Sequence, residues 1–248
     1  MASALLCGGI EYNATILPHD KDNDVVAYRF LAPQTTTIQN LPGTRKEVDS
    51  IYTFRKNPND KLLVSAEATD ENFLRLLKQN YDIIHLSTHG FYGGKIGIHN
   101  DIKPLLGNES MSQSGLLFAG SANTLTDENF DENLFDGVLS ATELSKQDLS
   151  QIELIVLSAC KTGLGRLTDD GIYGIERGLK QAGANAMILT LWSVSDYSSS
   201  LLMRFFYEEL EKQSSKDIHS AFLKARQRLI KEERIIYKFD ESTLTNKK

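Results

Sequence analysis

Cysteine is scarce in this sequence, with two residues in 248, at positions 7 and 160. Two cysteines form at most one bridge, which excludes a disulfide scaffold and favours a reducing, cytoplasmic setting. No uninterrupted apolar run approaches the ~20 residues that a membrane-spanning helix needs. The start of the chain has neither a basic segment nor an apolar stretch of at least about 7 residues, so it does not fit a signal peptide. We therefore expect a cytoplasmic protein with no membrane partner.

An excess of positive charge is also missing. The 27 Lys and Arg residues against 33 Asp and Glu residues give a formal net charge of −6. Nucleic-acid-binding domains usually present a basic surface to phosphate, so no direct nucleic-acid partner is expected. The segment KTGLG at 161–165 places its lysine before its glycines, the reverse of a phosphate-binding loop. The sequence predicts no cofactor.

The chain has the length and the apolar content of one α/β domain, with 248 residues of which 41% are hydrophobic. We predict a single domain over residues 1–240 and a flexible tail over 241–248. The acidic segment TDENFDENLFD at 126–136 is typical of a solvated surface loop. A regulatory or substrate-gating loop is the alternative interpretation.

Short apolar runs alternate with amphipathic stretches, which is the pattern of α/β architecture. Three of the runs, DIIHLS, ELIVLS and AMILTL, are continuously apolar, as is typical of central parallel strands covered by helices on both faces. The predicted strands are 4–10, 25–31, 61–65, 82–87, 115–119, 153–158 and 186–191.

Helix starts are marked at two places. Thr44 followed by Glu47 fits a capping box, and Thr69 opens the next helix. Apolar residues spaced three and four apart predict further helices, the first of them ended by Gly183. These helices lie at about 172–182, 197–210 and 218–230.

The predicted strand 82–87 leads into His89. It ends in Ser-Thr-His-Gly, which delivers His89 to the carboxyl edge of the sheet, where reactive groups collect in α/β folds. Gly90 leaves room for a backbone amide to approach a substrate oxygen. His85 would lie about 13 Å from His89 on an extended strand. We therefore predict that His85 is a buried core residue and that no metal is bound.

The predicted strand 153–158 delivers Cys160 to the same edge. One interpretation is a small buried side chain. The adjacent Lys161 and the glycines after it favour an accessible thiolate instead. A Cys–His dyad is the smallest arrangement that activates a thiol for attack on a carbonyl, so His89 and Cys160 are the candidate catalytic pair.

Cys7 is predicted to fill the core, with a Cys7–Cys160 bridge as an alternative that is unusual in the cytosol.

The predicted strand 186–191 runs into Trp192 and Asp196. Trp192 is expected to pack on the core and Asp196 to cap the next helix. A role for the same segment as the wall of a pocket is compatible with both.

Several segments in order resemble the motifs of the CHAT family, caspase-like cysteine peptidases that are often joined to tetratricopeptide repeats and distantly related to separase. The segment LPGTRKEV resembles the entry to the family's first helix, and the likeness spans about residues 7–230. The motifs are HLSTHG, SGLLFAG, DGVLSATEL, LIVLSACKTGLG, GIYGIERGLKQAGANAMILTLWSVSD and LMRFFYEEL.

The resemblance implies a caspase-like three-layer α/β sandwich with a central, mainly parallel sheet flanked by helices. It also implies that His89 and Cys160 are the catalytic pair and that the amides of Gly90 and Cys160 form the oxyanion hole. The expected activity is that of a cytoplasmic cysteine endopeptidase acting on specific protein substrates. A catalytically silent scaffold or sensor that binds protein partners, or a different thiol enzyme, is the alternative.

The resemblance further implies a pocket for the residue before the cut bond, formed by Ser158, Trp192, Ser193 and Asp196. In this pocket Asp196 either selects a basic side chain or serves as a helix cap. Because CHAT domains usually follow other modules, we expect that a native N-terminal module, such as a repeat domain that regulates the enzyme, is absent from this sequence.

Overall fold

The structure is a computed structural model with a five-stranded sheet at its centre. The residues that it describes are 2–15, 38–92, 95–96, 100–101, 111, 114–124, 137–158, 166–168, 171–190, 196–213 and 217–245. The strands of the central sheet are β1 (Ala4–Ile10), β2 (Lys61–Ser65), β3 (Ile83–Leu86), β9 (Leu154–Leu157) and β12 (Met187–Leu189). Their order is β12-β9-β3-β1-β2, and every pair is parallel.

The remaining described strands form two smaller antiparallel sheets. The larger, in the order β6-β5-β4-β7-β8, begins where the chain leaves β3. Its strands are β4 (Gly90–Tyr92), β5 (Lys95–Ile96), β6 (Asn100–Asp101), β7 (Ser114–Leu117) and β8 (Val138–Ser140). The other pairs β10 (Arg166–Thr168) with β11 (Gly171–Tyr173). The predicted strand 25–31 lies outside the described residues.

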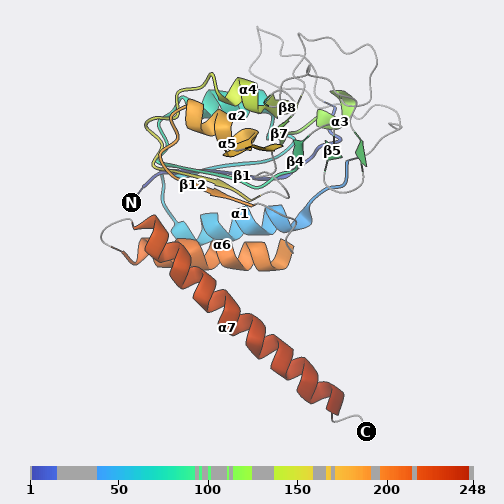
Figure 1. Cartoon of the computed structure of the whole chain (residues 1–248), viewed down its shortest axis with the longest axis vertical. Coiled ribbons are helices and arrows are strands. Elements are labelled where there is room, and N and C mark those ends of the chain that lie inside the picture. The colour runs from blue at the N-terminus through green and yellow to red at the C-terminus, as the bar shows by residue number, and fades with distance from the viewer. Residues whose placement is uncertain are drawn as a thin grey trace.

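Helices cover both faces of the central sheet (Figure 1). One face carries α1 (Pro42–Arg55), α6 (Asp196–Glu211) and α7 (Ile218–Thr245). The other carries α2 (Asp70–Leu77), α4 (Ala141–Leu144) and α5 (Ile175–Gln181), and the short α3 (Ser121–Thr124) lies beside the second sheet. These layers confirm the predicted α/β sandwich. Helix α7 extends away from the body and continues through Thr245, into the segment predicted as a tail.

Two hydrophobic cores lie on the two faces of the sheet, because successive strand residues point to opposite sides. In β1, Leu5 and Cys7 face the core under α2, α4 and α5. Leu6 and Ala4 face the core under α1 and α6. All four are fully buried. This alternation explains why the central strands carry apolar residues on both faces, with His85 of β3 as a buried polar exception.

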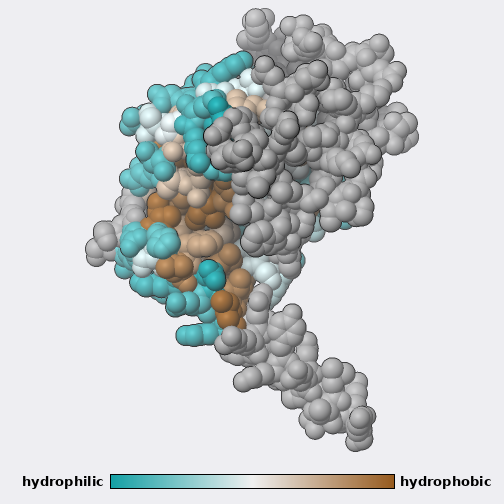
Figure 2. Space-filling model, in the orientation of Figure 1, coloured by the Kyte–Doolittle hydropathy of each residue, from teal (hydrophilic) through white to brown (hydrophobic). Residues whose placement is uncertain are grey.

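The strand predicted at 186–191 is present as β12, but its predicted central position in the sheet is wrong. The strand there, β12, is at the end of the sheet order, and its residues are only partly buried. Figure 2 shows an apolar area on this face of the molecule, where β12 meets α6 and α7. A strand at the edge of the sheet also packs on both cores, so it needs apolar side chains on both of its faces. Its composition therefore resembles that of a central strand.

The predicted capping box at Thr44 and Glu47 is also wrong. Helix α1 begins two residues earlier, with Pro42 in its first turn, where the missing N–H of proline costs no hydrogen bond. Thr44 instead accepts a hydrogen bond from the Gly9 amide at 3.0 Å, and the Glu47 carboxylate binds the His85 ring. The predictions for Thr69 and Gly183 are confirmed, since Thr69 caps α2 and Gly183 follows α5 with φ +92°.

A buried carboxyl group lies at the first residue of α2, Asp70. Burial raises the pKa of Asp70 to about 6, although backbone amides that bind the carboxylate, including that of Gly137, act in the opposite direction. One of its oxygens, Oδ1, has no hydrogen-bond partner among the described residues. The charged form of Asp70 is therefore unfavourable in the folded protein.

The Asp70→Asn variant tests how much the charged form of Asp70 destabilises the folded protein. The folded protein holds the Asp70 proton more tightly than the unfolded chain, whose pKa is 3.8, so the wild type loses stability as the pH rises through about 6. Relative to the wild type, Asp70→Asn should gain up to about 3 kcal/mol between about pH 4 and about pH 7.5. Urea unfolding at both pH values measures this difference. Glu71→Gln, on the same helix turn, is the control, and an equal gain in both variants would contradict the assignment.

Candidate active site

Strands β3 and β9 end side by side at the carboxyl edge of the central sheet. Leu86 pairs with Leu157 in parallel register. The pairing continues one residue further, because the Ser158 amide donates to the Leu86 carbonyl at 3.0 Å and the Ser87 hydroxyl donates to the Ser158 carbonyl at 3.1 Å. The two segments that follow β3 and β9 therefore leave the sheet next to each other. The sequence predicted this arrangement, because both strands end at the same edge of the sheet.

His89 follows β3 by three residues and is partly exposed. Its Nε2 lies 2.8 Å from the backbone carbonyl of Gln39. A carbonyl oxygen only accepts hydrogen bonds, so Nε2 carries a proton and donates it. In the neutral ring, Nδ1 is then the basic nitrogen. Sequence reasoning missed Gln39, because a backbone carbonyl has no residue type by which a pattern could mark it.

A chain of hydroxyl groups holds the backbone of His89. The His89 amide donates to the Tyr12 hydroxyl at 3.2 Å, the Tyr12 and Thr88 hydroxyl oxygens are 3.0 Å apart, and Thr88 donates to the Leu117 carbonyl. The Tyr12 ring also packs against the His89 ring, with centroids 4.9 Å apart. Tyr12 and Thr88 are completely buried. Tyr12 was not among the predicted site residues.

Gly90 opens β4 and pairs with Leu116 of β7. The hydrogen bond beside this pair runs from the Leu117 amide to the His89 carbonyl. In an antiparallel ladder this pattern directs the Gly90 amide away from β7. A backbone donor thus follows His89 directly and points to the side of β4 that faces away from β7.

A cavity of about 510 Å³ lies under the ends of β9 and β12, against α6 and α7. Ser158 and Thr190 line it at the ends of the two strands, and Met203 and Phe222 are among its apolar walls. Arg226 is the charged residue in its lining. Of the predicted pocket residues, Ser158 therefore borders a hollow at the carboxyl edge.

Of the other predicted site residues, only Asp196 belongs to the part of the chain that the structure describes. Cys160, Trp192 and Ser193 lie outside the described residues. Asp196 is the first residue of α6.

The two further candidates from the sequence, His85 and Cys7, are core residues, as predicted. His85 is completely buried and lies 2.8 Å from Glu47 through Nε2 and 3.2 Å from the Tyr207 hydroxyl through Nδ1. Among the described residues, no group of three His, Cys, Asp or Glu side chains is arranged to hold a metal. Cys7 is a buried free thiol whose pKa is raised by burial, so the alternative Cys7–Cys160 bridge is wrong.

Comparison with known proteins identifies a family. The family model described as "CHAT domain" matches residues 17–241, most of the chain. Tetratricopeptide repeat protein 28 of Mus musculus is 34% identical over 73 residues. That segment is 29% of this chain but 3% of the mouse protein, so the likeness covers a small part of that relative. No described helix is both long enough and apolar enough to span a membrane.

The Tyr12→Phe variant tests the hydroxyl chain. It keeps the ring against His89 but removes the group that joins the His89 amide to Thr88, so the free energy of unfolding should fall by about 1–3 kcal/mol. Urea unfolding measures the change. Tyr81→Phe is the control, because the Tyr81 hydroxyl makes a long contact of 3.4 Å with Gln79. Equal losses in the two variants would show that the Tyr12 hydroxyl has no special role.

Proposed function

This chain belongs to the CHAT domain family, and from that membership and the geometry around His89 we propose that it is a cysteine endopeptidase that cleaves specific protein substrates. Cys160 is the nucleophile in this proposal, and His89 is the general base and then the general acid.

The observation that carries the proposal is the register between β3 and β9. Beyond the two strands, the Ser87 hydroxyl donates to the Ser158 carbonyl, and these residues are 71 positions apart in the sequence. His89 and Cys160 have the same separation, and each follows its member of this contact by two residues. Because each candidate follows this contact by only two residues, which span at most about 7 Å, the register supports a dyad of His89 and Cys160.

The protonation of His89 suits the chemistry. With Nε2–H held by the Gln39 carbonyl, Nδ1 takes the proton of the Cys160 thiol. The thiolate attacks the carbonyl carbon of the substrate peptide bond, and the oxyanion binds to the Gly90 and Cys160 amides. The imidazolium then protonates the leaving amine as the C–N bond breaks. Water hydrolyses the acyl-enzyme in a second step of the same kind. The Gln39 carbonyl favours the imidazolium form throughout.

Substrate selection is proposed to involve Ser158, Trp192, Ser193 and Asp196. Asp196 would place a carboxylate against a basic residue before the cut bond, while the cavity beside Ser158 would accommodate apolar groups. Since the name of the mouse relative refers to tetratricopeptide repeats, we further propose that a repeat module regulates the enzyme. A reducing, cytoplasmic compartment would keep the Cys160 thiol available.

Peptide-library profiling tests the proposal directly. Wild-type protein should cleave members of a randomised library, Cys160→Ala should abolish cleavage, and His89→Ala should lower kcat/KM by about 10²–10⁴-fold. Cys7→Ser is unsuitable as a control because Cys7 is buried, so Lys146→Ala, a change at an exposed residue, serves instead.

Each outcome of the profiling separates the alternatives. Cleavage that survives in Cys160→Ala would refute the assignment of the nucleophile. Absence of cleavage, together with no His89-dependent labelling of Cys160 by a peptide electrophile, would favour a silent scaffold. Cuts after Arg or Lys that disappear in Asp196→Asn would support the acidic pocket, and cuts after apolar or acidic residues alone would remove Asp196 from that role.

A further inference from the structure

A buried polar pair lies on β3 four residues before His89. His85 and Glu47 are 0% and 2% exposed, and Nε2 of His85 is 2.8 Å from Oε1 of Glu47. A carboxylate accepts, so the His85 ring donates from Nε2. Its Nδ1 lies 3.2 Å from the hydroxyl of Tyr207, which donates to it in the neutral ring. Both nitrogens of His85 thus have a partner in the core.

The same two segments of chain that make this contact also meet at His89. Glu47 belongs to α1, and Gln39 lies in the segment that leads into α1. His85 belongs to β3, and His89 follows it. The chain around α1 is therefore joined to the chain around β3 at two points, from Glu47 to His85 and from Gln39 to His89. A shift of α1 along β3 would break both contacts together.

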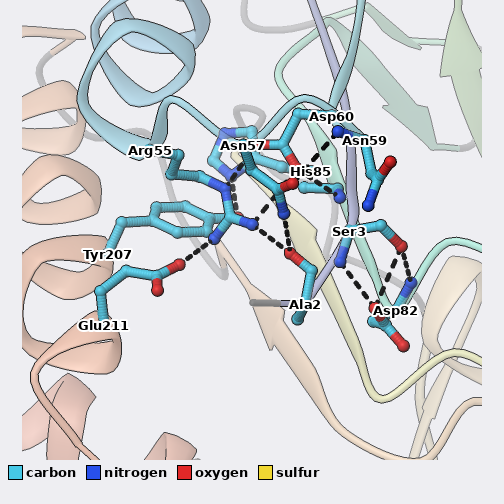
Figure 3. Close-up of polar contacts among 11 residues, drawn as sticks. Ala2, Ser3, Arg55, Asn57, Asn59, Asp60, Asp82, His85, Tyr207 and Glu211 are labelled. Carbon is cyan, nitrogen blue, oxygen red and sulfur yellow. Dashed lines mark hydrogen bonds and ion pairs between the residues drawn. The ribbon is translucent and has the colours of Figure 1, made fainter.

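A network of ion pairs anchors the far end of α1 (Figure 3). Arg55, its last residue, binds Asp60 at 2.8 Å and also binds Glu211 of α6. The Arg55 guanidinium lies 5.6 Å from the centroid of the Tyr207 ring. Helix α6, which begins at the candidate pocket residue Asp196, is thus tied to α1 and, through Tyr207, to His85. The elements that carry His89, Gln39 and Asp196 converge on one buried cluster.

Stability alone gives little reason for a buried polar pair in this place. Removing a carboxylate and an imidazole from water costs free energy, and well-packed apolar residues of similar volume are often as stable or more so. A hydrogen bond between buried groups does, however, define one relative position of two elements, whereas apolar contacts tolerate sliding.

We propose that Glu47 and His85 are positioning residues for His89. Their hydrogen bond fixes α1 on β3 so that the Gln39 carbonyl holds Nε2–H and presents Nδ1 toward the nucleophile. The assignment of Nδ1 as the catalytic base rests on the proposed function, whereas the alignment of the His89 ring does not.

Variants with and without the hydrogen bond separate positioning from stability. Glu47→Gln keeps an oxygen that accepts from His85. An apolar variant, defined as Glu47→Met, His85→Phe and Tyr207→Phe together, removes all the polar partners at once, and it should unfold at a urea concentration near that of the wild type. Asp49→Asn, an exposed change on the same helix, is the matched control.

The first measurement is the pH dependence of Cys160 alkylation by iodoacetamide, followed by peptide mass spectrometry. Cys7 is completely buried and does not interfere in the folded protein. In the apolar variant, the rate at neutral pH should fall at least about tenfold. Its midpoint should move toward the value of about 8.5 of an ordinary thiol. Glu47→Gln and Asp49→Asn should stay within about twofold of the wild type, since both keep the His85 contact.

The second measurement is the ¹⁵N spectrum of the His89 ring, which reports its tautomer without any need for catalysis. Wild type and Glu47→Gln should show the single Nε2–H tautomer, and the apolar variant a mixture. If the apolar variant does not fold, Glu47→Asp replaces it, because the shorter side chain keeps the charge but withdraws the oxygen, and the same losses are expected.

Either a folded apolar variant with the wild-type alkylation profile and a single His89 tautomer, or a loss in Glu47→Gln equal to that in the apolar variant, would overturn the positioning role. Failure of the proposed function has a different signature. His89→Ala would then leave Cys160 alkylation unchanged, while the ¹⁵N spectra would still decide whether Glu47 and His85 align the His89 ring.

Discussion

The parallel pairing of β3 with β9 is the constraint on which the candidate site depends. Both strands are buried on both faces, so their backbone amides and carbonyls have to be paired within the sheet, since an unpaired buried group costs as much as a lost hydrogen bond. This requirement allows one register, with Leu86 beside Leu157. A slip by one residue would reverse the faces of every side chain in the strand. The chain segments that continue to His89 and Cys160 consequently start from adjacent points.

The polar cluster on the α1 and α6 face of the sheet is the second feature on which the candidate site depends. Most of this core is apolar, yet it contains His85, Glu47, Tyr207 and Arg55, each with partners in the cluster. Buried polar groups stabilise one arrangement only when all their partners are in place. The opposite core, under α2, α4 and α5, is filled by aliphatic and aromatic side chains and by Cys7. The two faces thus contribute differently: polar contacts on the α1 and α6 face fix helices on the sheet, whereas the opposite face is packed by apolar groups and adds the Tyr12 hydroxyl that binds the His89 amide.

Local signals predicted the strands of the central sheet well, missed most strands of the two smaller sheets, and predicted the helix starts unevenly. The bounds of β1 and β2 match the predicted runs, each of which has an apolar centre, at 5–7 in β1 and at 62–64 in β2. Thr44 and Glu47 have the spacing of a capping box, but tertiary contacts with Gly9 and His85 use both side chains elsewhere. A capping box does form at Ser140 and Glu143 of α4, where no tertiary partner competes for the two side chains in the described contacts. The edge position of β12 was missed because packing on two cores gives the same composition as burial between two strands.

The sequence by itself determined the α/β class, the two apolar strands that end at His89 and before Cys160, and the core roles of Cys7 and His85. These depend on periodicity and residue type along short stretches of chain. Only the tertiary structure decided which groups surround His89. Gln39 acts through its carbonyl, Tyr12 through a hydroxyl 77 positions from His89, and Glu47 through a contact with His85 across 38 positions. Backbone groups are the same in every residue, and contacts between distant segments leave no local pattern, so the fold has to be formed before such partners can be identified.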